Sequence, residues 1–407
     1  MIALCCVFLL PNPDSRYVAR FSNMYASSSM THALERPSDT MSASPCLRQV
    51  DRALSELRRG GLVILQGENG ESGLVLAAEA VTQQALNQLR QLAASRPVLA
   101  ITNRRAEVLG LGSAQSEAVS LTLDDGADAE FVQSIADPLA PRPATNRPMG
   151  LAPIGGACCA GAAVRLTKLA RLLPAALMAP LPQEGQREAL AKSHDLLTVT
   201  VADILAYPES AARSMRQVAW ARVPLEAELE TKILAFRPAD GGIEHLAILI
   251  GNPDASQPVL VRLHSECFTG DLLGSLRCDC GDQLRGAISE IAKTGGGALL
   301  YLAQEGRGIG LVNKLRAYRL QDAGLDTLDA NGELGFEDDE RVYLPAAEML
   351  RQLGFSSVRL LTNNPLKVKA LAKHGIDVAQ RVPHVFPSNG HNEFYLRTKA
   401  DKAGHLF

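Results

Sequence analysis

Apolar residues recur along the chain at helical and at strand spacings, and this pattern predicts the order of the secondary structure. In the N-terminal half it predicts helices and strands that alternate at 50–57, 62–65, 82–92, 97–101, 162–173 and 196–201. In the C-terminal half it predicts strands at 231–236, 245–250, 259–263, 298–302 and 358–361, and helices at 281–293, 309–321, 340–353 and 365–373. Strands that alternate with helices are typical of α/β and α+β folds, so we expect mixed sheets covered by helices.

The strength of these signals divides the chain into domains. Residues 208–227 carry few periodic positions, and we place a linker there, between one domain at 47–207 and a second at 228–407. A length of 407 residues fits two domains of about 150–200 residues each. Residues 1–46 begin with an apolar run shorter than the roughly 20 residues that cross a bilayer. Ser-, Thr- and Met-rich sequence follows the run, and we expect a disordered leader.

Composition excludes several classes of partner. Hydrophobic residues make up 46% and charged residues 21% of the chain, as in a water-soluble globular protein. The formal charge of −3 gives no overall attraction to nucleic acid or to an anionic membrane, so we expect neither as a partner. The chain is too long to need a disulfide framework, which indicates a reducing, cytoplasmic setting in which clustered thiols bind metal.

Three of the eight cysteines, Cys267, Cys278 and Cys280, lie within one short segment. Zinc favours thiolates: structural sites use four protein ligands, whereas catalytic sites use three and leave one position to water. No cysteine follows Cys280, so either His264 closes the site or a water position stays open. An extended C-x-C would place both thiols on one face. The alternative without a metal is a set of buried cysteines.

Polar clusters follow three of the predicted strands. Arg262–Glu266 ends one strand, and Gln304–Gly310 joins another to a helix. Glycines let a backbone approach a ligand, a helix N-terminus favours phosphate, and Arg307 adds a bidentate donor for anions. Thr362–Pro365 is a similar turn, followed by Lys367. Each cluster alone also fits a solvated strand end, a strained turn or an exposed lysine.

Two further features are ambiguous when taken singly. The charge run Asp338–Arg341 precedes a predicted helix and fits either a solvated helix start or a group that holds a base, a metal ligand and an anion contact. Tyr318 lies in a predicted helix with Lys314 and Arg316, where it could stack in a pocket or pack in a core.

Taken together, these segments resemble GTP cyclohydrolase II. The most specific string is R-x-H-S-E-C…C-x-C-G-x-Q, which spans Arg262–Gln283. Glu305–Arg307, Asp339–Arg341 and Thr362–Lys367 complete the resemblance, which covers about 225–407.

The resemblance implies a reaction and its cofactors. GTP would lose formate and pyrophosphate to give 2,5-diamino-6-(5-phosphoribosylamino)pyrimidin-4(3H)-one, the first step of riboflavin biosynthesis. One Zn²⁺ per subunit would lie on Cys267, Cys278 and Cys280, and Mg²⁺ would accompany the triphosphate. The implied GTP contacts are Arg262, Leu263, His264, Ser265, Glu266, Gln283, Glu305, Gly306, Arg307, Thr327, Thr362 and Lys367.

The resemblance also implies catalytic roles. Asp339 matches the proton acceptor, Tyr318 an active-site tyrosine, and Arg341 the residue proposed to attack the α-phosphate. Because a guanidinium is protonated at any ordinary pH, a role for Arg341 as a charge clamp stays open. Glu305 and Gln283 have the polar groups to pair with the guanine edge and to select it over adenine.

The N-terminal half resembles 3,4-dihydroxy-2-butanone-4-phosphate synthase in outline, but the catalytic strings of that family differ here. Its acidic loop appears as residues 66–73, QGENGESG, its R-P-G-H string as Arg147–Gly150 without the histidine, and its G-H-T-E string as Cys158–Gly161. Magnesium needs clustered oxygen ligands, so we expect an inactive domain that serves as a dimer scaffold or regulatory surface. We expect a homodimer. The competing hypothesis for the whole chain is a nucleotide-binding regulatory protein with a structural zinc.

Overall fold

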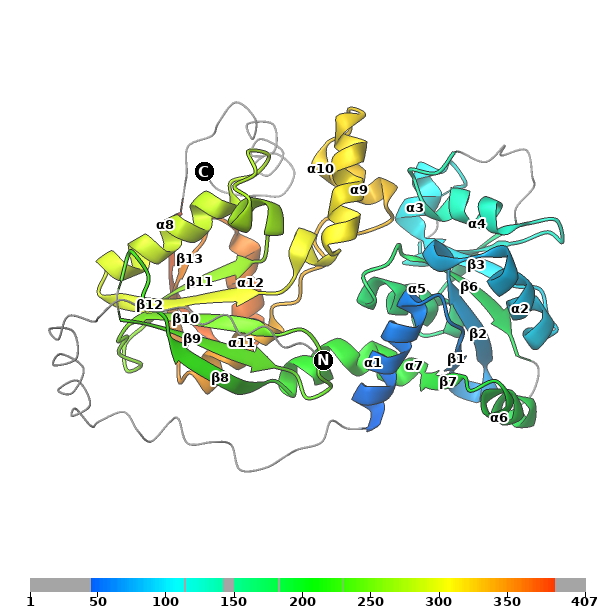
Figure 1. Cartoon of the computed structure of the whole chain (residues 1–407), viewed down its shortest axis with the longest axis horizontal. Coiled ribbons are helices and arrows are strands. Elements are labelled where there is room, and N and C mark those ends of the chain that lie inside the picture. The colour runs from blue at the N-terminus through cyan, green and yellow to red at the C-terminus, as the bar shows by residue number, and fades with distance from the viewer. Residues whose placement is uncertain (1–44, 113–114, 142–149, 182–183, 229, 385–407) are drawn as a thin grey trace, which may run out of the picture. The chain divides into compact units, whose positions relative to one another are not determined.

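The computed structural model describes residues 45–112, 115–141, 150–181, 184–228 and 230–384, and all of these belong to one compact unit. Two seven-stranded sheets organise this unit, one in each half of the sequence (Figure 1). The expected mixed sheets with helices are therefore confirmed. The predicted leader falls outside the described residues except for Pro45 and Cys46, which begin helix α1.

The first sheet has the strand order β5-β4-β3-β6-β2-β1-β7. Only the β1–β7 pair is parallel among its pairs. Its strands are β1 (Val63–Gln66), β2 (Ser72–Ala77), β3 (Val98–Thr102), β4 (Ala118–Thr122), β5 (Leu151–Ile154), β6 (Ala175–Pro180) and β7 (Leu197–Thr200).

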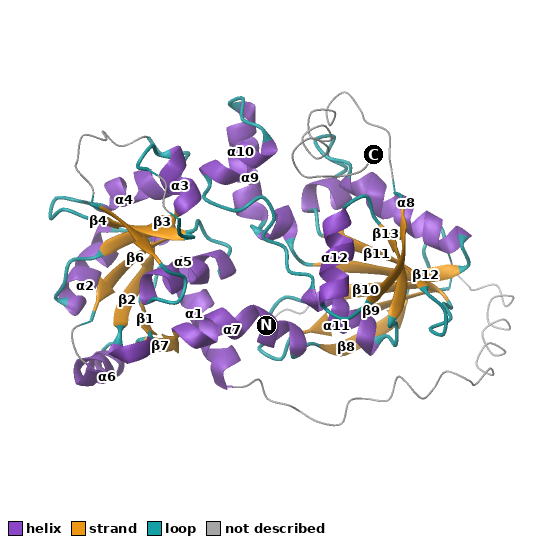
Figure 2. Cartoon of the chain, turned by 180° about the vertical axis from the view of Figure 1, so that it is seen from behind, coloured by secondary structure: helices purple, strands orange, loops and turns teal. Residues whose placement is uncertain are grey.

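Helices cover both faces of the first sheet (Figure 2). Alternating strand residues face opposite sides: Ile64 packs with α2 and α4, whereas Val63 and Leu65 pack with α1, α5 and α7. The helices are α1 (Pro45–Arg58), α2 (Gln83–Ala93), α3 (Asn103–Val108), α4 (Ala129–Ala136), α5 (Cys159–Leu169), α6 (Glu184–Ser193) and α7 (Val201–Arg213). Thr82, the first residue of the helix expected at 82–92, caps α2 by accepting a hydrogen bond from the Ala85 amide.

The second sheet has the order β14-β13-β11-β12-β10-β9-β8. The strands from β14 to β12 are parallel, and those from β12 to β8 are antiparallel. They are β8 (Arg216–Arg222), β9 (Thr231–Arg237), β10 (His245–Gly251), β11 (Val259–Ser265), β12 (Gly296–Leu302), β13 (Ser357–Leu361) and β14 (Asp377–Val382).

Helices also cover both faces of the second sheet. Helix α8 packs on one face, and α11 and α12 pack on the other. A separate apolar cluster joins α9 and α10 to Leu139 and Leu173 of the N-terminal half. The helices are α8 (Cys280–Lys293), α9 (Leu311–Asp322), α10 (Thr327–Glu333), α11 (Leu344–Gln352) and α12 (Pro365–Lys373).

Two sequence-based boundaries differ from the structure. The stretch 208–227, expected to be a linker, contains the end of α7 and all of β8, so the second sheet begins at Arg216. The helix expected at 340–353 begins at Leu344, because Glu340 bonds back to the Arg307 carbonyl and Pro345 suits a first helical turn. The division into domains at 47–207 and 228–407 stays a prediction.

None of the described helices is both long and apolar enough to span a membrane.

Candidate active site

The polar clusters meet because three neighbouring strands of the second sheet are parallel. Strands β13, β11 and β12 lie side by side and point the same way. The segments that follow their carboxyl ends therefore converge at one edge of the sheet, the usual ligand position in such sheets. They are Glu266–Asp279 after β11, Ala303–Gly310 after β12 and Thr362–Asn364 after β13.

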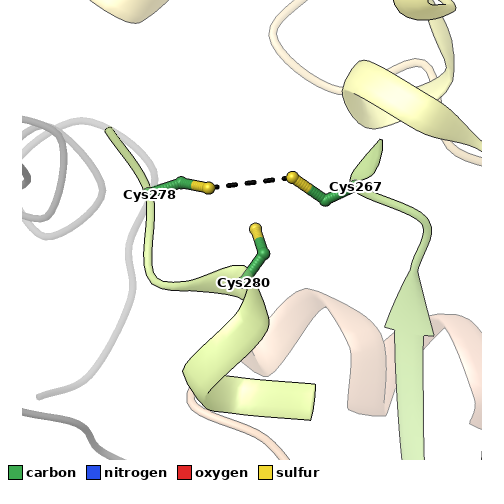
Figure 3. A group of neighbouring side chains, drawn as sticks. All are labelled: Cys267, Cys278 and Cys280. Atoms are coloured by element: carbon green, nitrogen blue, oxygen red, sulfur yellow. Dashed lines mark hydrogen bonds between the residues drawn. The ribbon is translucent and has the colours of Figure 1, made fainter. Parts of the chain in front are cut away.

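The three thiols point toward one another at this edge (Figure 3). Cys267 follows β11, Cys278 lies in a loop, and Cys280 begins α8. The expectation of an extended C-x-C is wrong: Asp279 has φ −98° and ψ 10°, and this turn brings both thiols to Cys267. Among the described residues, this trio is the one group of His, Cys, Asp and Glu side chains close enough to hold a metal, with all sulfurs within 4.8 Å of one another.

The spacing of the sulfurs fits zinc. The Sγ atoms of Cys267 and Cys278 are 3.7 Å apart. Four ligands at about 2.3 Å from a tetrahedral zinc would place two sulfurs about 3.8 Å apart. Gly270 leaves the space that the sulfurs need, since a Cβ there would lie 2.7 Å from Cys278 Sγ and 3.0 Å from Cys267 Sγ.

Lys314 and two thiols favour the thiolate form of Cys267. Hydrogen bonds from Cys278 and Cys280, with the Lys314 ammonium, lower the pKa of Cys267 far below its usual value. Lys314 Nζ lies 3.0 Å from Cys267 Sγ, 2.9 Å from Thr269 Oγ1 and 2.8 Å from Glu305 Oε1. The pKa of Cys278 rises to about 11, because it donates to Cys267. Full ionisation of the trio therefore needs a cation among the sulfurs.

His264 does not join the thiols. Its Nε2 lies 3.1 Å from Asp271 Oδ1, and burial lowers its pKa although Asp271 opposes that shift. Asp271 also accepts from the Cys267 amide at 2.9 Å and from the Tyr301 hydroxyl at 2.9 Å. His264 therefore fixes the loop that carries Cys267. Its Nδ1 is buried and has no hydrogen-bond partner among the described residues.

The loop Gln304–Gly310 turns through left-handed backbone conformations. Gly306, Arg307 and Gly308 have φ of 63°, 60° and 100°. Arg307 is unusual there because it carries a side chain; its guanidinium donates to the Asp338 carbonyl at 3.1 Å. Glu305 is 3% exposed, and its carboxylate accepts from Lys314 and from the amides of Gly306 and Phe268. Glu305 thus supports the loop, and its pairing with guanine stays a prediction.

Asp339 and Arg341 form a two-pronged ion pair. Arg341 Nε and Nη2 lie 2.7 Å and 2.6 Å from the two Asp339 oxygens. Burial opposes the charge of Asp339, but the hydrogen bonds and charge of Arg341 hold its pKa below the usual value. Asp339 is therefore ionised at neutral pH.

Arg262 and Lys367 bring buried positive charge. Burial lowers the pKa of Arg262 to about 10, which keeps it a cation at neutral pH. It donates to the Leu361 carbonyl at 2.9 Å and to Gln283 Oε1. Lys367 Nζ donates to the Leu263 carbonyl at 2.9 Å. The Leu263 side chain itself packs in the core.

A pocket at this edge collects most of the predicted site residues. Leu263 and Asp339 are absent from its lining, although Asp339 pairs with Arg341, which is present. The predicted residues that line it are Arg262, His264, Ser265, Glu266, Cys267, Cys278, Cys280, Gln283, Glu305, Gly306, Arg307, Tyr318, Thr327, Arg341, Thr362 and Lys367.

Two predicted residues of the pocket have distinctive surroundings. Burial raises the pKa of Tyr318 to about 12, so the phenol is protonated at neutral pH. The Arg277 guanidinium lies 4.7 Å from the Tyr318 ring centre. Burial, followed by the charge of Glu305, raises the pKa of the half-buried Glu266.

Sequence reasoning assigned no role to several lining residues. They include Lys314, which the sequence placed only in the same predicted helix as Tyr318, and Arg277 and His384, for which the sequence predicted no role. His384 lies 2.9 Å from the Gln283 carbonyl, and burial lowers its pKa to about 4. The one available signal was the position of Lys314. It lies three residues before Ala317, on the face of the predicted helix that should be buried.

Comparisons with known proteins agree with this geometry. The family model of GTP cyclohydrolase II matches residues 216–383. The GTP cyclohydrolase-2 of Azospirillum brasilense is 57% identical over 369 residues, which cover 89% of this chain and 94% of that protein. That of Xylella fastidiosa (strain Temecula1) is 40% identical and covers 92% and 90%. The riboflavin biosynthesis protein RibBA of Phocaeicola vulgatus is 34% identical and covers 88% and 97%.

A solved structure gives a weaker match. It is RibBX, a two-domain 3,4-dihydroxy-2-butanone 4-phosphate synthase from A. baumannii, at 18% identity and a TM-score of 0.33, covering 83% of this chain and 99% of that one. A similarity this weak does not establish the fold of either half. The alignment with the Azospirillum protein is longer than the family model's match, so it extends into the N-terminal half.

Proposed function

Because this chain belongs to the GTP cyclohydrolase II family of riboflavin biosynthesis, we propose that it hydrolyses GTP at a zinc site formed by Cys267, Cys278 and Cys280. The products are formate, pyrophosphate and 2,5-diamino-6-(5-phosphoribosylamino)pyrimidin-4(3H)-one. The convergence of three thiols into one pocket with the other site residues carries the proposal. When bound there, zinc supplies a Lewis acid and a water that ionises near neutral pH.

The protein's own residues bind GTP and move protons. Arg262, Arg307 and Lys367 supply positive charge for the triphosphate, with Mg²⁺ as a further counter-charge. Asp339 is ionised and accepts a proton. Tyr318 is protonated at neutral pH and acts as a donor rather than a base.

We assign Arg341 the role of a charge clamp. A guanidinium that pairs through two nitrogens with a carboxylate is held as a cation, which disfavours nucleophilic attack. In this role it stabilises charge that develops on the α-phosphate as pyrophosphate leaves. An ion pair with Asp339 also keeps that carboxylate beside the site.

The test is turnover of GTP by the purified chain with Mg²⁺, before and after a chelator removes zinc. We expect formate, pyrophosphate and the pyrimidine product together, loss of all three without zinc, and recovery on its return. Formate release that survives zinc removal would contradict the zinc site. Binding of GTP with no turnover would favour a regulatory protein with a structural zinc. The expected setting is cytoplasmic and the expected assembly a homodimer, which sedimentation of the same sample tests.

We further propose that the N-terminal half does not act on ribulose 5-phosphate. In the loop that replaces the acidic one, the Glu71 carboxylate accepts from the Cys159 amide at 3.0 Å, which places it at the start of α5. Burial, with the charge of Glu71, raises the pKa of the Cys159 thiol to about 12. The Arg147–Gly150 string lies outside the described residues except for Gly150. Incubation of the whole chain with ribulose 5-phosphate and Mg²⁺ should yield no dihydroxybutanone phosphate, and its formation would refute this proposal.

A further inference from the structure

The N-terminal half contacts two parts of the chain that carry site residues. One runs from the Gln304–Gly310 loop into α9, and the other is the Asp338–Arg341 segment. Leu139 and Leu173 share an apolar cluster with Ile309 and Phe336. Arg316 of α9 pairs with Glu79 at 3.0 Å. Ile309 lines the pocket itself, and Arg316 shares α9 with the pocket residues Lys314 and Tyr318.

Arg171, just after α5, holds both ends of the Gln304–Gly310 loop. Its Nη2 donates to the carbonyl of Ala303, the residue before the loop, at 2.7 Å. Its own carbonyl accepts from Asn313 Nδ2, in the first turn of α9, at 3.1 Å. Its aliphatic stem packs on Gly310, where an added Cβ would lie 3.1 Å from Arg171 Cβ.

The backbone of Arg171 belongs to the turn that ends α5. Its φ of 59° is left-handed, and the amides of Arg171 and Leu172 donate to the Lys168 and Thr167 carbonyls at 2.9 Å and 3.0 Å, which closes the end of the helix. Burial lowers the pKa of Arg171, whereas the nearby Glu266 and Glu305 carboxylates favour its charge. The guanidinium is thus both a donor to the loop and a counter-charge to two pocket residues.

Lys168, in the last turn of α5, holds the second segment. Its Nζ lies 2.6 Å from Glu340 Oε1, and both side chains are 22% exposed. Glu340 lies between Asp339 and Arg341, and its amide donates to the Arg307 carbonyl at 3.1 Å. Lys168 therefore forms an ion pair with Glu340, the residue whose amide joins the Asp338–Arg341 segment to the Gln304–Gly310 loop.

We propose that Lys168 and Arg171 are positioning residues through which the N-terminal half holds the GTP site in its reactive geometry. The loop needs such support, because Gly306, Gly308 and Gly310 do not favour one conformation on their own, and Arg307 has a left-handed conformation that its side chain disfavours. This role goes beyond the proposed function and rests on it only because GTP turnover is the readout.

The first experiment compares Arg171→Met, Arg171→Lys and Arg165→Met in the full chain. Met keeps the stem and the same backbone strain but removes the donor. Lys restores a cation. Arg165 lies on α5, is exposed, and has no hydrogen bond or ion pair with the described residues, so it serves as the control.

We expect Arg171→Met to lower kcat by roughly tenfold and to change KM for GTP by less than about twofold, because small displacements of reacting groups slow the chemistry. Arg171→Lys should regain part of kcat, and Arg165→Met should match the wild type.

A second experiment measures the coupling of Lys168 and Glu340. If they act as a pair, Lys168→Met combined with Glu340→Gln should lower kcat no more than the more damaging single change. If Arg171→Met does not fold, this double-mutant cycle still tests the positioning role. Additive losses in the cycle, or an Arg171→Met chain with wild-type kcat and only a lower Tm, would overturn the positioning role. Zinc content is measured alongside and should not change. A wild-type chain that releases no formate would instead contradict the proposed function.

Discussion

Removal of the Lys314 ammonium should destabilise the protein by breaking its ion pair with a buried carboxylate, that of Glu305. Lys314 and Glu305 are 9% and 3% exposed, and their charged atoms are 2.8 Å apart. Breaking one side of a buried ion pair costs about 3–5 kcal/mol. The amides of Gly306 and Phe268 still donate to Glu305 in Lys314→Met, so we expect a loss near the lower end, about 3 kcal/mol.

The double variant Lys314→Met/Glu305→Gln separates this charge effect from lost packing. The amides of Phe268 and Gly306 donate to different oxygens of Glu305, so the one oxygen of the Gln amide still accepts from one of them, and the amide carries no charge to be left unpaired. We therefore expect the double variant to be more stable than the sum of the single losses by about 2 kcal/mol.

Urea unfolding of the two single variants and the double variant measures these quantities. Lys293→Met is the control, because Lys293 is exposed in the last turn of α8; it should change the unfolding free energy by less than about 0.5 kcal/mol. A Lys314→Met chain that loses less than about 1 kcal/mol, or a double variant equal to the sum, would refute the reasoning, because neither fits a desolvated charge pair.

Two further predictions concern the pocket. The folded-state pKa of Asp339 is depressed, so its ion pair contributes stability above the unfolded pKa of about 3.9 and loses it as pH falls through the folded value. The difference in unfolding free energy between wild type and Asp339→Asn should therefore be constant near neutral pH and shrink below about pH 4; a constant difference throughout would contradict the pair. Gly270→Ala should lower zinc content, since its Cβ would lie 2.7 Å from Cys278 Sγ. Gly155→Ala, where a Cβ meets nothing within 4 Å, should not, and equal zinc in both would refute the steric argument.

Local signals allowed much of the fold to be predicted. The bounds of α12 agree with the prediction because Asn364 caps the helix and Pro365 fits its first turn. Helix α11 begins later than its apolar pattern suggests, because Glu340 is drawn to Arg307 by a contact distant in sequence.

The site residues that were missed depend on three-dimensional neighbours. Lys314 reaches the thiols from α9, and His384 reaches the Gln283 carbonyl from the end of β14. The helical spacing of Lys314 indicates that it is buried but not that it contacts the thiols, and no spacing indicates the position of His384. The turn at Asp279 likewise replaces the expected extended C-x-C, because Cys280 has to begin a helix while its thiol faces Cys267.

The most direct test of the zinc-bound site counts zinc and formate in the same Cys280→Ser sample. Cys280 joins a trio with sulfurs within 4.8 Å, so its loss removes one of the three proposed zinc ligands. The account predicts one zinc per chain and formate release in the wild type, and loss of both in Cys280→Ser with GTP and Mg²⁺ present. Formate release at the wild-type rate from a Cys280→Ser chain that holds no zinc would contradict it.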